Sequence, residues 1–596
     1  MALIAAALVT TAASAALPGS ANAGELVYKG CLAARSPVHD GKKSCKETAE
    51  GDNVIDDPLT LALSPDGGSL YTGSGVWCNG RQTECSARAT VGRFGRDPVT
   101  GALAYRDCLT GDIPVYGAPT DCTQIAAAEP RAFGAGLADV AAVAVSPDGR
   151  SLYAASARDL CGDYDCYGGN ALARFDRDPA TGALTYRDCI TGDQRSGPSG
   201  SGACTEIPSA TPEGQGSGLL DLRALALSPD GKSLYTAATK YVAGGRGDAA
   251  IARFDRDPET GVLVYRGCIT GDTALGPSGS GACAEIPTAA ANVGRSGLGD
   301  PQSVTVSPDG ISVYVGGDII ARFDRDPATG DLTYVGCFAG KGSSAAAVCT
   351  EIPQPMYPQT PVMSPDGRFV YASGDVRAEG STHPAGVVQF RRDPGTGALT
   401  YERTVKGPIG GSMALGANGR ALYTGSMYST VARYRVDRRT GRASYAGCLT
   451  GDRGETGCTP IPTATGGAFA SGLERIGAMA ATGRSLYAVS TGGHGDDIAR
   501  FAIAPQTRIA KGRTRGQRAV FKFRARPASR FECKLTGRHV KRKLRRWRHC
   551  GSRGFGRHGK QVYRHLRPGR KVFKVRATDR SRTTDPTPAK HRWRIY

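Results

Sequence analysis

The feature that most constrains this chain is a turn motif that recurs between two short apolar stretches. Pro before Asp-Gly favours a tight turn, and aliphatic and aromatic residues on either side favour β-strands. Repeated units of this kind cannot bury their apolar faces alone and therefore stack on their neighbours. Ser-Pro-Asp-Gly occurs at residues 64–67, 146–149, 228–231, 307–310 and 364–367, and degenerate copies lie at 417–419 and 481–483. The sequence therefore predicts seven stacked units.

The second unit illustrates the strand pattern of the repeat. Strands are predicted at residues 143–145, 152–155, 173–176 and 184–187, and Asp-Pro-Ala-Thr-Gly at 178–182 forms the last turn. Four short antiparallel strands in a unit of this length are typical of a propeller blade.

The seventh unit has three strands, because the pattern stops after residues 498–501. The segment at 25–31 resembles the fourth strands of other units, such as 443–448, in residue type. The N-terminal strand is therefore predicted to complete the last unit, which removes two exposed sheet edges. The predicted fold of residues 24–504 is an all-β, seven-bladed β-propeller closed by its N-terminal strand.

Two repeated motifs carry a resemblance to known proteins. The Ser-Pro-Asp-Gly-x-x-aliphatic-Tyr repeat and the Arg-Phe-Asp-Arg-Asp-Pro-x-Thr-Gly-x-Leu turn resemble the lactonase-like (6-phosphogluconolactonase type) and YVTN-type seven-bladed propellers over residues 25–504. The resemblance implies the fold. It implies little about activity, because the repeated residues are structural turns.

The chain carries signs of export. Residues 1–23 are apolar and end in Ala-Asn-Ala, which predicts a signal peptide, although no Lys or Arg precedes the apolar stretch; the alternative is a disordered Ala-rich tail. No later run reaches the roughly 20 apolar residues of a membrane span. The chain is therefore expected to be secreted or extracellular, including cell-wall associated.

The cysteines support an oxidising compartment. Their even number, 18, and their short recurring spacings favour local disulfides, and zinc is the alternative, although no C-x₂-C pair occurs. The predicted pairs are Cys31 with Cys45, Cys78 with Cys85, Cys108 with Cys122, Cys161 with Cys166, Cys189 with Cys204, Cys268 with Cys283, Cys337 with Cys349, Cys448 with Cys458, and Cys533 with Cys550.

Functional sites are expected on the face opposite the uniform turns, where loops vary in length and hold the predicted propeller disulfides. Asp57, Asp139, Asp221 and Asp300 each lie seven residues before the turn position of their unit, at the entrance of an innermost strand. A ring of carboxylates there would hold Ca²⁺, another hard cation or a cationic ligand. The alternative is that each Asp caps neighbouring backbone amides.

Catalytic side chains are scarce in this region. His383 and His494 fall in loops of the candidate face, and Arg475, Glu206 and Glu285 are available as partners, but no spacing pairs them. Arg246-Gly247-Asp248 would mimic an integrin-binding loop, or it is a chance tripeptide in a Gly-rich loop.

Composition changes abruptly at Pro505. Residues 505–596 hold 31 Lys and Arg against three acidic residues, a net charge of +28, so the rest of the +21 chain carries −7. Apolar and basic residues alternate at 520–524 and 572–577, as in half-buried strands. The pattern resembles bacterial Ig-like modules through Phe531, Cys533, Leu535, Gly537, Cys550, Tyr563, Leu566, Gly569, Phe573, Val575-Arg576-Ala577, Asp579, Asp585, Pro588-Ala589 and Trp593. This resemblance implies a small β-sandwich of the kind that acts as a surface spacer or adhesion unit.

A charge of this size attracts polyanions. The densest stretch surrounds Trp547 and consists of Lys541, Arg542, Lys543, Arg545, Arg546 and Arg548. Candidate partners are teichoic-type wall polymers, anionic polysaccharide, extracellular DNA and anionic lipid. The alternative is that the charge aids solubility or docks the module on the acidic propeller.

Two functions remain open from the sequence. The first is a non-catalytic binding or scaffold protein of the cell surface, with a protein or ligand partner on the loop face and the basic module as a tether. The second is a lactonase-like hydrolase with its site on the same loop face.

Overall fold

The computed structural model divides the chain into two compact units, one at Leu26–Ile503 and one at Ala504–Tyr596 that also includes Glu25. Within the described residues both units are all-β, with short 3₁₀ helices (η) and no α-helix. The structure describes residues 25–33, 38–39, 42–48, 58–75, 90–113, 122–130, 136–137, 139–157, 170–200, 202–212, 214–239, 248–279, 281–354, 357–375, 386–408, 410–454, 456–466, 471–491, 497–551 and 554–596.

The 26–503 unit consists of seven similar sheets, numbered I to VII here, and a two-stranded ribbon, β2 (Val38–His39) with β3 (Lys42–Lys43). Sheet I contains β5 (Pro58–Leu63), β6 (Ser69–Ser74), β7 (Thr90–Arg96), β8 (Leu103–Ile113) and β9 (Thr123–Pro130). Sheet II contains β10 (Val140–Val145), β11 (Ser151–Ser156), β12 (Ala171–Arg177), β13 (Leu184–Asp193) and β14 (Thr205–Thr211). Sheet III contains β15 (Leu222–Leu227), β16 (Ser233–Ala238), β17 (Ala250–Arg256), β18 (Leu263–Asp272) and β19 (Ala284–Ala290).

The remaining sheets follow the same order along the chain. Sheet IV contains β20 (Ser303–Val306), β21 (Ser312–Gly316), β22 (Ile319–Arg325), β23 (Leu332–Gly340) and β24 (Thr350–Ile352). Sheet V contains β25 (Tyr357–Met363), β26 (Phe369–Asp375), β27 (Gly386–Arg392) and β28 (Leu399–Lys406). Sheet VI contains β29 (Ser412–Leu415), β30 (Ala421–Gly425), β31 (Thr430–Val436), β32 (Ala443–Asp452) and β33 (Thr459–Thr465). Sheet VII contains β34 (Arg475–Ala481), β35 (Ser485–Thr491), β36 (Asp497–Ile503), β1 (Leu26–Ala33) and β4 (Lys46–Glu47). Among the described residues of this unit, four 3₁₀ helices lie in the connections: η1 (Gln194–Ser196), η2 (Thr273–Leu275), η3 (Val293–Arg295) and η4 (Ser344–Ala347).

The hydrophobic core lies between neighbouring sheets. Leu172 of sheet II and Leu234 and Phe254 of sheet III belong to one buried cluster. The second strands β6, β11 and β16 are buried along their whole length, because a further sheet covers each of their faces. Each sheet is therefore stable only in the presence of its neighbours, as in other repeat proteins.

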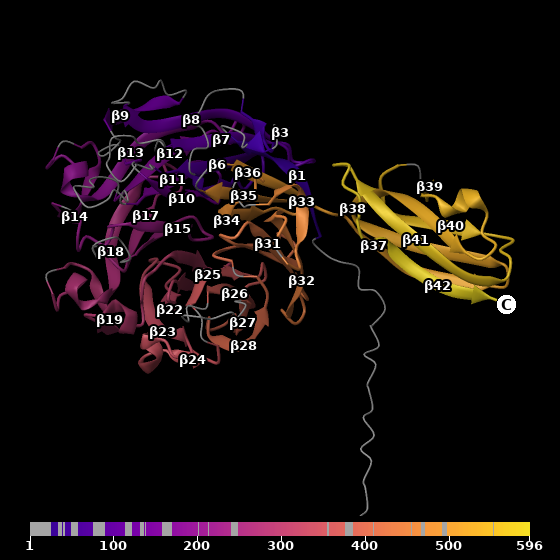
Figure 1. The fold of residues 1–596 in the computed structure, drawn as a ribbon. Coiled ribbons are helices and arrows are strands. Elements are labelled where there is room, and N and C mark those ends of the chain that lie inside the picture. The colour runs from indigo at the N-terminus through magenta and orange to yellow at the C-terminus, as the bar shows by residue number, and fades with distance from the viewer. Residues whose placement is uncertain are drawn as a thin grey trace, which may run out of the picture. The chain divides into compact units, whose positions relative to one another are not determined.

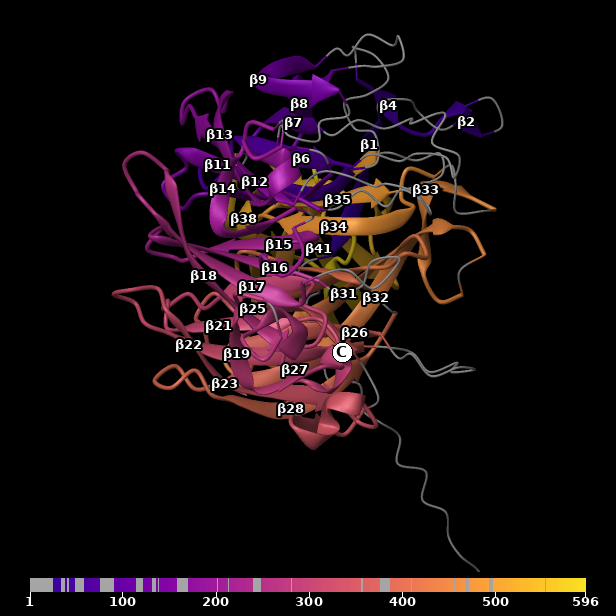
Figure 2. The same cartoon turned by 90° about the vertical axis from the view of Figure 1, so that its left-hand side faces the viewer.

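The sheets stack in chain order, as in a β-solenoid, and the first strands of successive sheets contact one another. Strand β34 of the last sheet also contacts β5 of the first. In Figure 1 the orange strands β34–β36 accordingly lie beside the indigo strands β1 and β6, although hundreds of residues separate them in the sequence. Figure 2 shows the same neighbourhood from the side.

Strand β1 completes sheet VII, as the sequence predicts. It pairs antiparallel with β36, with Leu26 opposite Ile503 and Ala33 opposite Asp497. Tyr28 packs edge-on against Phe501 with 5.5 Å between ring centroids. The N-terminal strand thus covers the edge that β36 would otherwise expose.

The sheets differ from the prediction in one respect, because six of the seven have a fifth strand that runs parallel to the fourth. A disulfide joins the fourth strand to the residue immediately before the fifth in each of these sheets. The bonds are Cys31–Cys45, Cys108–Cys122, Cys189–Cys204, Cys268–Cys283, Cys337–Cys349 and Cys448–Cys458. Sheet V has neither the disulfide nor, among the described residues, the extra strand. The cross-link therefore holds the returning loop against the sheet edge.

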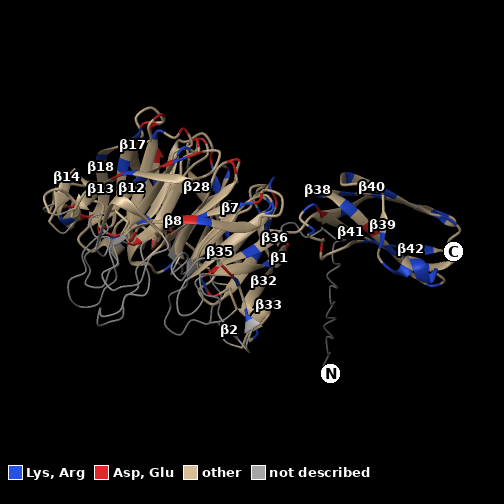
Figure 3. Cartoon of the chain, turned by 90° about the horizontal axis from the view of Figure 1, so that it is seen from above, with Lys and Arg blue, Asp and Glu red and all other residues tan. Residues whose placement is uncertain are grey.

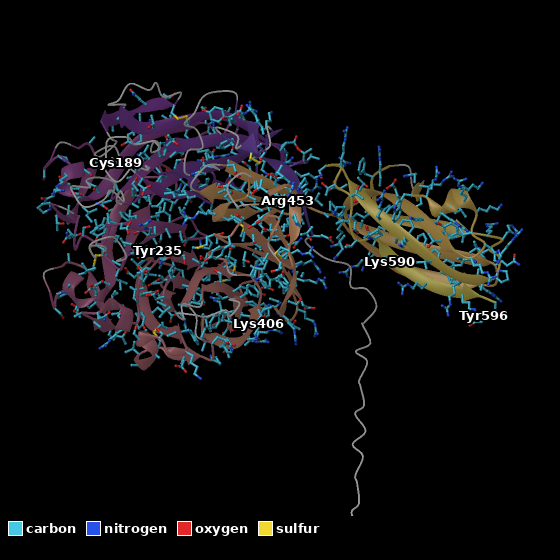
Figure 4. The ribbon with its side chains drawn as sticks, viewed as in Figure 1. Cys189, Tyr235, Lys406, Arg453, Lys590 and Tyr596 are labelled. Atoms are coloured by element: carbon cyan, nitrogen blue, oxygen red, sulfur yellow. A yellow bond between two sulfur atoms is a disulfide. The ribbon has the colours of Figure 1, made fainter. Side chains whose placement is uncertain are left out.

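Seven of the nine predicted disulfides are confirmed, including Cys533–Cys550 of the second unit; the sulfur atoms are yellow in Figure 4, where Cys189 is labelled. The other two predicted pairs, Cys78 with Cys85 and Cys161 with Cys166, stay predictions, because Cys78, Cys85, Cys161 and Cys166 all lie outside the described residues. A membrane-spanning helix of sufficient length and apolarity is absent from the described parts of the chain. The disulfides are compatible with an extracellular protein.

The Ser-Pro-Asp-Gly turn is a closed hydrogen-bonded unit. The Ser64 hydroxyl donates to Asp66 at 2.6 Å, and the backbone N–H groups of Gly68 and Ser69 donate to Asp66 and to the Ser64 hydroxyl at 2.7 and 2.9 Å. Gly67 has φ of +69°, which a side chain would disfavour. The turn thus points one oxygen of Asp66 toward the next sheet.

A buried arginine uses that oxygen to join neighbouring sheets. Arg177, the last residue of β12, donates to Asp66 at 2.8 Å, to the Tyr71 hydroxyl at 2.7 Å and to the Gly149 carbonyl at 2.8 Å. The Tyr71 hydroxyl in turn donates to the Gly182 carbonyl of sheet II at 2.6 Å. We call this arrangement the inter-sheet latch. It recurs with Arg256, Asp148 and Tyr153, with Arg325, Asp230 and Tyr235, and with Arg392, Asp309 and Tyr314.

The latch also joins the last sheet to the first. Arg96 of sheet I donates to the hydroxyl of Tyr487 in sheet VII at 2.7 Å, and Tyr487 donates to the Gly101 carbonyl at 2.7 Å. Thr482 takes the place of the aspartate and accepts from Arg96 at 3.3 Å. The contact between β34 and β5 is therefore made by the same chemistry as the internal junctions.

Two junctions lack the arginine. Val436 and Ile503 end the third strands of sheets VI and VII, where the other units have arginine. Asp366 of sheet V, left without an inter-sheet arginine, pairs with Arg368 of its own turn at 2.9 Å. The Tyr371 hydroxyl still donates to the Gly441 carbonyl of sheet VI at 2.7 Å.

The 504–596 unit is built around the long strand β38 (Arg518–Gly537). Its first half pairs with β37 (Gln506–Arg515) and β40 (Gly556–Tyr563), and its second half pairs with β41 (Gly569–Asp579) and β39 (Arg548–Cys550). Strand β42 (Ala589–Ile595) pairs with β41, and η6 (Arg542–Arg545) lies between β38 and β39. One buried cluster that includes Phe521, Phe531 and Phe573 forms the core.

We predict that loss of the latch hydroxyl has the same cost at the VII–I junction as at an internal junction. Tyr71→Phe and Tyr487→Phe each leave buried hydrogen-bonding groups unpaired, so each should lower the free energy of unfolding by about 1–3 kcal/mol in a denaturant titration. The control is Tyr428→Phe, whose side chain is 62% exposed. A loss of stability for Tyr71→Phe without one for Tyr487→Phe would show that sheets VII and I do not meet in solution.

Candidate functional site

The structure describes three of the four predicted ring aspartates. Asp139, Asp221 and Asp300 are buried directly before or near the first strands of their sheets, and Asp57 lies outside the described residues. Asp221 and Asp300 have φ of +61° and +43°, a left-handed conformation that Asp tolerates better than most residues. The backbone conformation therefore gives a structural reason for an aspartate at this point of the repeat.

Side chains of neighbouring residues contact the carboxylates of Asp221 and Asp300. Asp221 pairs with Arg223 at 2.8 Å. Asp300 accepts from Gln302 at 3.0 Å and from the Thr239 hydroxyl of the preceding sheet. Arg223 thus balances the charge of Asp221, whereas Gln302 and Thr239, which contact Asp300, are neutral hydrogen-bond donors.

The described residues contain a single group of three or more metal-ligand side chains with ligand atoms within 4.8 Å, and it is not formed by the ring aspartates. Its members are Cys31, Cys45 and Asp497, and the two sulfurs are already bonded to each other. A disulfide sulfur lacks the thiolate charge that binds metals. The Ca²⁺ site at the predicted ring of aspartates stays a prediction, because the described residues form no close group of ligands there.

The catalytic candidates do not meet among the described residues. His383 and His494 lie outside them, and Arg475 is exposed at the start of β34. Glu206 accepts from the backbone N–H and hydroxyl of Ser199 at 2.7 and 2.8 Å, and Glu285 makes the same pair of bonds with Ser278 at 2.8 and 2.9 Å. Both glutamates therefore hold the loop that their disulfide closes.

Asp248 is a buried carboxylate that the sequence indicates only as the last residue of Arg246-Gly247-Asp248, the tripeptide that resembles an integrin-binding loop. It is fully buried and accepts from the backbone N–H groups of Gly216, Gly218 and Leu220 at 2.9, 2.7 and 3.0 Å. The integrin-like interpretation is therefore wrong for this residue, because its carboxylate is not available to a partner. Its role is to fix the loop that enters β15.

Burial raises the pKa of Asp248 to about 6, although the three N–H donors and Ser217 favour the charged form. The pKa values of the latch aspartates shift in the opposite direction. Burial alone raises the pKa of Asp148, but hydrogen bonds from Ser146, the Arg150 N–H and Arg256 outweigh it, so the pKa lies below its usual range. The pKa values of Asp66, Asp230 and Asp309 are lowered in the same way.

An open depression of about 700 Å³ lies between sheets II and III, on the side of the uniform turns. Three of its four arginines are already paired within the protein: Arg177 with Asp66, Arg174 with Asp188 at 2.6 Å, and Arg187 with Asp176 at 2.7 Å. The fourth, Arg150, is exposed. The lining residues include no histidine, cysteine or lysine. The depression therefore offers a charged, hydrogen-bonded surface without a nucleophile and base in contact.

The 504–596 unit holds the strongest candidate surface. Strand register places like charges directly opposite one another in two rows of three lysines across adjacent strands. The first row is Lys511 of β37, Lys522 of β38 and Lys560 of β40, and the second is Lys534 of β38, Lys574 of β41 and Lys590 of β42. Like charges in cross-strand positions destabilise a sheet. Blue Lys and Arg positions are accordingly spread over these strands in Figure 3, and red positions are scarce.

The six predicted polyanion-binding residues are all exposed or half-exposed, on η6, on β39 and beside them: Lys541, Arg542, Lys543, Arg545, Arg546 and Arg548. None of them has a carboxylate partner among the described residues. Arg545 donates to the Val540 carbonyl at 3.0 Å, which orients part of this segment.

Trp547 is covered by the protein's own cations. The Arg576 guanidinium lies over its ring at 4.4 Å from the centroid, and the Lys534 ammonium lies at 5.9 Å. Arg576 also pairs with Glu532 at 2.8 Å. This arrangement supports the interpretation of Trp547 as a packing residue rather than a platform for a ligand.

No protein-family model and no curated protein match this sequence. Among solved structures the chain is similar to a putative 6-phosphogluconolactonase from Bacteroides fragilis (18% identity, TM-score 0.39, covering 65% of this chain and 82% of that one). It is also similar to a periplasmic gluconolactonase from Pseudomonas aeruginosa (15%, 0.40, 66% and 85%) and to the β-propeller domain of Myceliophteria thermophila Cps50 (10%, 0.41, 75% and 97%). These neighbours are propeller-like, and TM-scores below 0.5 support no conclusion about activity.

The latch aspartates predict loss of stability in acid. Because their folded-state pKa values are depressed, their contribution is present above the ordinary Asp pKa of about 4 and is lost as pH falls through the folded values. Asp148→Asn should lower the melting temperature at pH 7 and reduce its decline below pH 4. An unchanged acid limb in the variant would contradict this assignment.

Asp248 predicts a separate effect of opposite sign. Its raised pKa gives a contribution that is present below about pH 4 and is lost as pH rises through about 6. Melting curves between pH 4 and 8 should show that Asp248→Asn removes this part of the pH dependence. Glu259→Gln, an exposed acidic residue, is the control and should leave the profile as it is. A wild-type profile that is retained in Asp248→Asn would refute the prediction.

Proposed function

We propose that this chain is an exported, non-catalytic binding protein of the cell surface. In this proposal residues 26–503 form a closed, seven-bladed β-propeller that displays its loop face to a ligand or protein partner. Residues 504–596 form an Ig-like β-sandwich that tethers the protein to an anionic polymer. The like-charged lysine rows of the second unit carry the proposal.

Three contacts support closure of the first unit into a ring. Strand β1 completes sheet VII, β34 contacts β5, and Arg96 joins Tyr487 across the junction of the last and first sheets. Closure would leave none of the seven sheets with an unpacked outer face. A rigid ring of this kind holds its connecting loops in fixed positions, as binding loops require.

The strand pairing of the second unit supports the Ig-like assignment. The first half of β38 pairs with β37, and the second half pairs with β41. Side chains from both halves meet in one core, as in a small sandwich. The Cys533–Cys550 disulfide joins β38 to β39 at the border of that core. Export is supported by the seven described disulfides and by the Ala-rich leader in the sequence.

The tethering role follows from unfavourable charge placement. Lysines that face each other across neighbouring strands repel, and carboxylates to neutralise them are almost absent from the unit. A bound polyanion would relieve this repulsion and release counterions, which strengthens binding at low salt. A surface needed only for solubility would not require cations aligned in rows.

The alternative function, a lactonase-like hydrolase, has no described contact in its favour. His383 and His494 lie outside the described residues, and Arg475 is exposed on the edge of its sheet. Hydrolysis of a lactone by the wild-type chain, abolished in His383→Ala or His494→Ala, would support this function against the binding role.

We predict salt-sensitive binding of heparin by the full chain. Replacement of Lys541, Arg542, Lys543, Arg545, Arg546 and Arg548 by Gln should weaken binding, because each of these cations is expected to neutralise one anionic group. The slope of log K against log salt should fall by about one for each anionic group that is no longer neutralised. A titration at several salt concentrations measures both the affinity and the slope.

The matched control removes the same charge from exposed cations of the 26–503 unit: Arg106, Arg150, Lys232, Arg420, Arg438 and Arg439. It should bind nearly as the wild type does. Elution of the wild type from a heparin column below about 0.15 M salt, the physiological ionic strength, or equally weakened binding in the two variants, would overturn the tethering role.

A further inference from the structure

The 504–596 unit presents its cations on two outer faces rather than one. The first half of β38 and the second half of β38 belong to two groups of strands: β37 and β40 flank the first half, and β41 and β42 extend from the second. Which way each side chain points follows from where the core lies.

Ring contacts show that the two groups of strands face each other. Phe521, from the first half of β38, stacks on Phe573 of β41 with ring centroids 4.1 Å apart, and its centroid is 5.2 Å from that of Trp593 of β42. Phe523 lies 4.9 Å from Phe531 of the second half of β38. These side chains therefore fill the space between the two groups, and residues at alternate positions point outward on opposite sides.

The outward side of the first group, which we call face A, carries the row Lys511, Lys522 and Lys560. Arg508 and Arg524 are paired in register beside that row. All five side chains are exposed.

The outward side of the second group, face B, carries the row Lys534, Lys574 and Lys590. Arg570 and Arg594 form a further like-charged pair on the same strands. Lys590, labelled in Figure 4, lies on the last strand of the row.

The two faces differ in their acidic residues. Glu532, half-buried and paired with Arg576, adds a negative charge to the second half of β38, beside the lysine row of face B. The strands of face A, β37, β40 and the first half of β38, contain no acidic residue. Face A is therefore expected to bind a polyanion more tightly than face B.

The dimensions separate the two faces as binding surfaces. Neighbouring strands are about 4.8 Å apart, so each row of three lysines spans about 10 Å across its strands. The two groups pack about 10 Å apart through the core, and the side chains add to that separation. A polymer segment that follows the lysine row on one face therefore cannot follow the row on the other without folding around the edge of the unit.

We propose that the basic unit is bivalent: face A and face B each bind one strand of a linear polyanion, so that a single protein chain cross-links two polymer strands. This inference rests on the proposed function, because it assumes that the cations bind a polyanion. A lipid surface would meet one face only, which makes a linear polymer the partner that fits the arrangement. The chemistry shared by its sources, sulfate, phosphate or carboxylate groups at regular spacing, is what the lysine rows recognise.

The test uses the full chain and short heparin oligosaccharides, some labelled with a fluorescence donor and the others with an acceptor. Calorimetry should give two oligosaccharides for each protein chain, and energy transfer between donor and acceptor should rise when protein is added. Sedimentation of the complex establishes that a single protein chain is present.

Two matched variants separate the faces. Lys511→Gln, Lys522→Gln and Lys560→Gln together alter face A, and Lys534→Gln, Lys574→Gln and Lys590→Gln together alter face B. Each variant should bind one oligosaccharide and lose the energy transfer. The combination of all six changes should lose both lysine-row sites, and any binding that remains should be removed by the Gln replacements at Lys541, Arg542, Lys543, Arg545, Arg546 and Arg548. Melting curves check folding, and removal of cross-strand repulsion should leave the melting temperature of the variants equal or higher.

The outcomes distinguish the two proposals. No oligosaccharide binding by the wild type at low salt would refute the tethering role and the cross-linking together. Binding of one oligosaccharide by the wild type without energy transfer would overturn cross-linking alone. Energy transfer that persists in both single-face variants, or binding to anionic lipid vesicles without binding to oligosaccharides, would also overturn it.

Discussion

The hydrogen-bonded latch between neighbouring sheets is the interaction on which the 26–503 unit depends. A sheet with apolar residues on both faces has no stable existence alone, and a buried arginine without partners would be costly. Arg177 avoids both costs. It joins two neighbouring sheets, and its own donors are paired with the Asp66 carboxylate, the Tyr71 hydroxyl and the Gly149 carbonyl. The same chemistry at Arg96 and Tyr487 links residues 391 positions apart. The uniform turns are therefore parts of the joints between sheets, which explains why they vary so little along the chain.

The disulfides act at the opposite ends of the strands. Each described disulfide of the 26–503 unit fastens the residue before a fifth strand to the fourth strand, so a loop that would otherwise leave the sheet is added to it. Sheet V lacks the cysteines and, among its described residues, the fifth strand, so the two features occur together. A buried carboxylate also fixes a loop at the entrance to β15, because Asp248 accepts hydrogen bonds from three backbone N–H groups of that loop. The loop face is thus held by covalent and polar contacts together with apolar packing, because Cys268, Cys283 and Leu219 belong to one buried cluster.

The second unit follows a different principle, because its core is apolar and its surface carries unbalanced positive charge. Phe521 and Phe573 stack in the core, and strand register places lysine opposite lysine on the outside. Like charges in these positions repel one another, which is a cost that packing in the core has to offset. The pairing of Arg576 with Glu532 is a local exception that leaves the lysine rows intact.

The repeat, the missing fourth strand, the local cysteine pairs and the basic segment could all be predicted from the sequence, because each depends on spacing or composition within a short stretch. The count of strands also predicted the pairing of β1 with β36, but side-chain contacts between distant residues could not be predicted in this way. The partner of Arg177 lies 111 residues away in the Asp66 turn, and the burial of Asp248 depends on a loop about 30 residues before it. The register that aligns Lys522 with Lys511 and Lys560, and the packing that separates the two cationic faces, exist only once the strands have paired. Local physical chemistry therefore determined the elements of this protein, and only tertiary structure decided which charges meet.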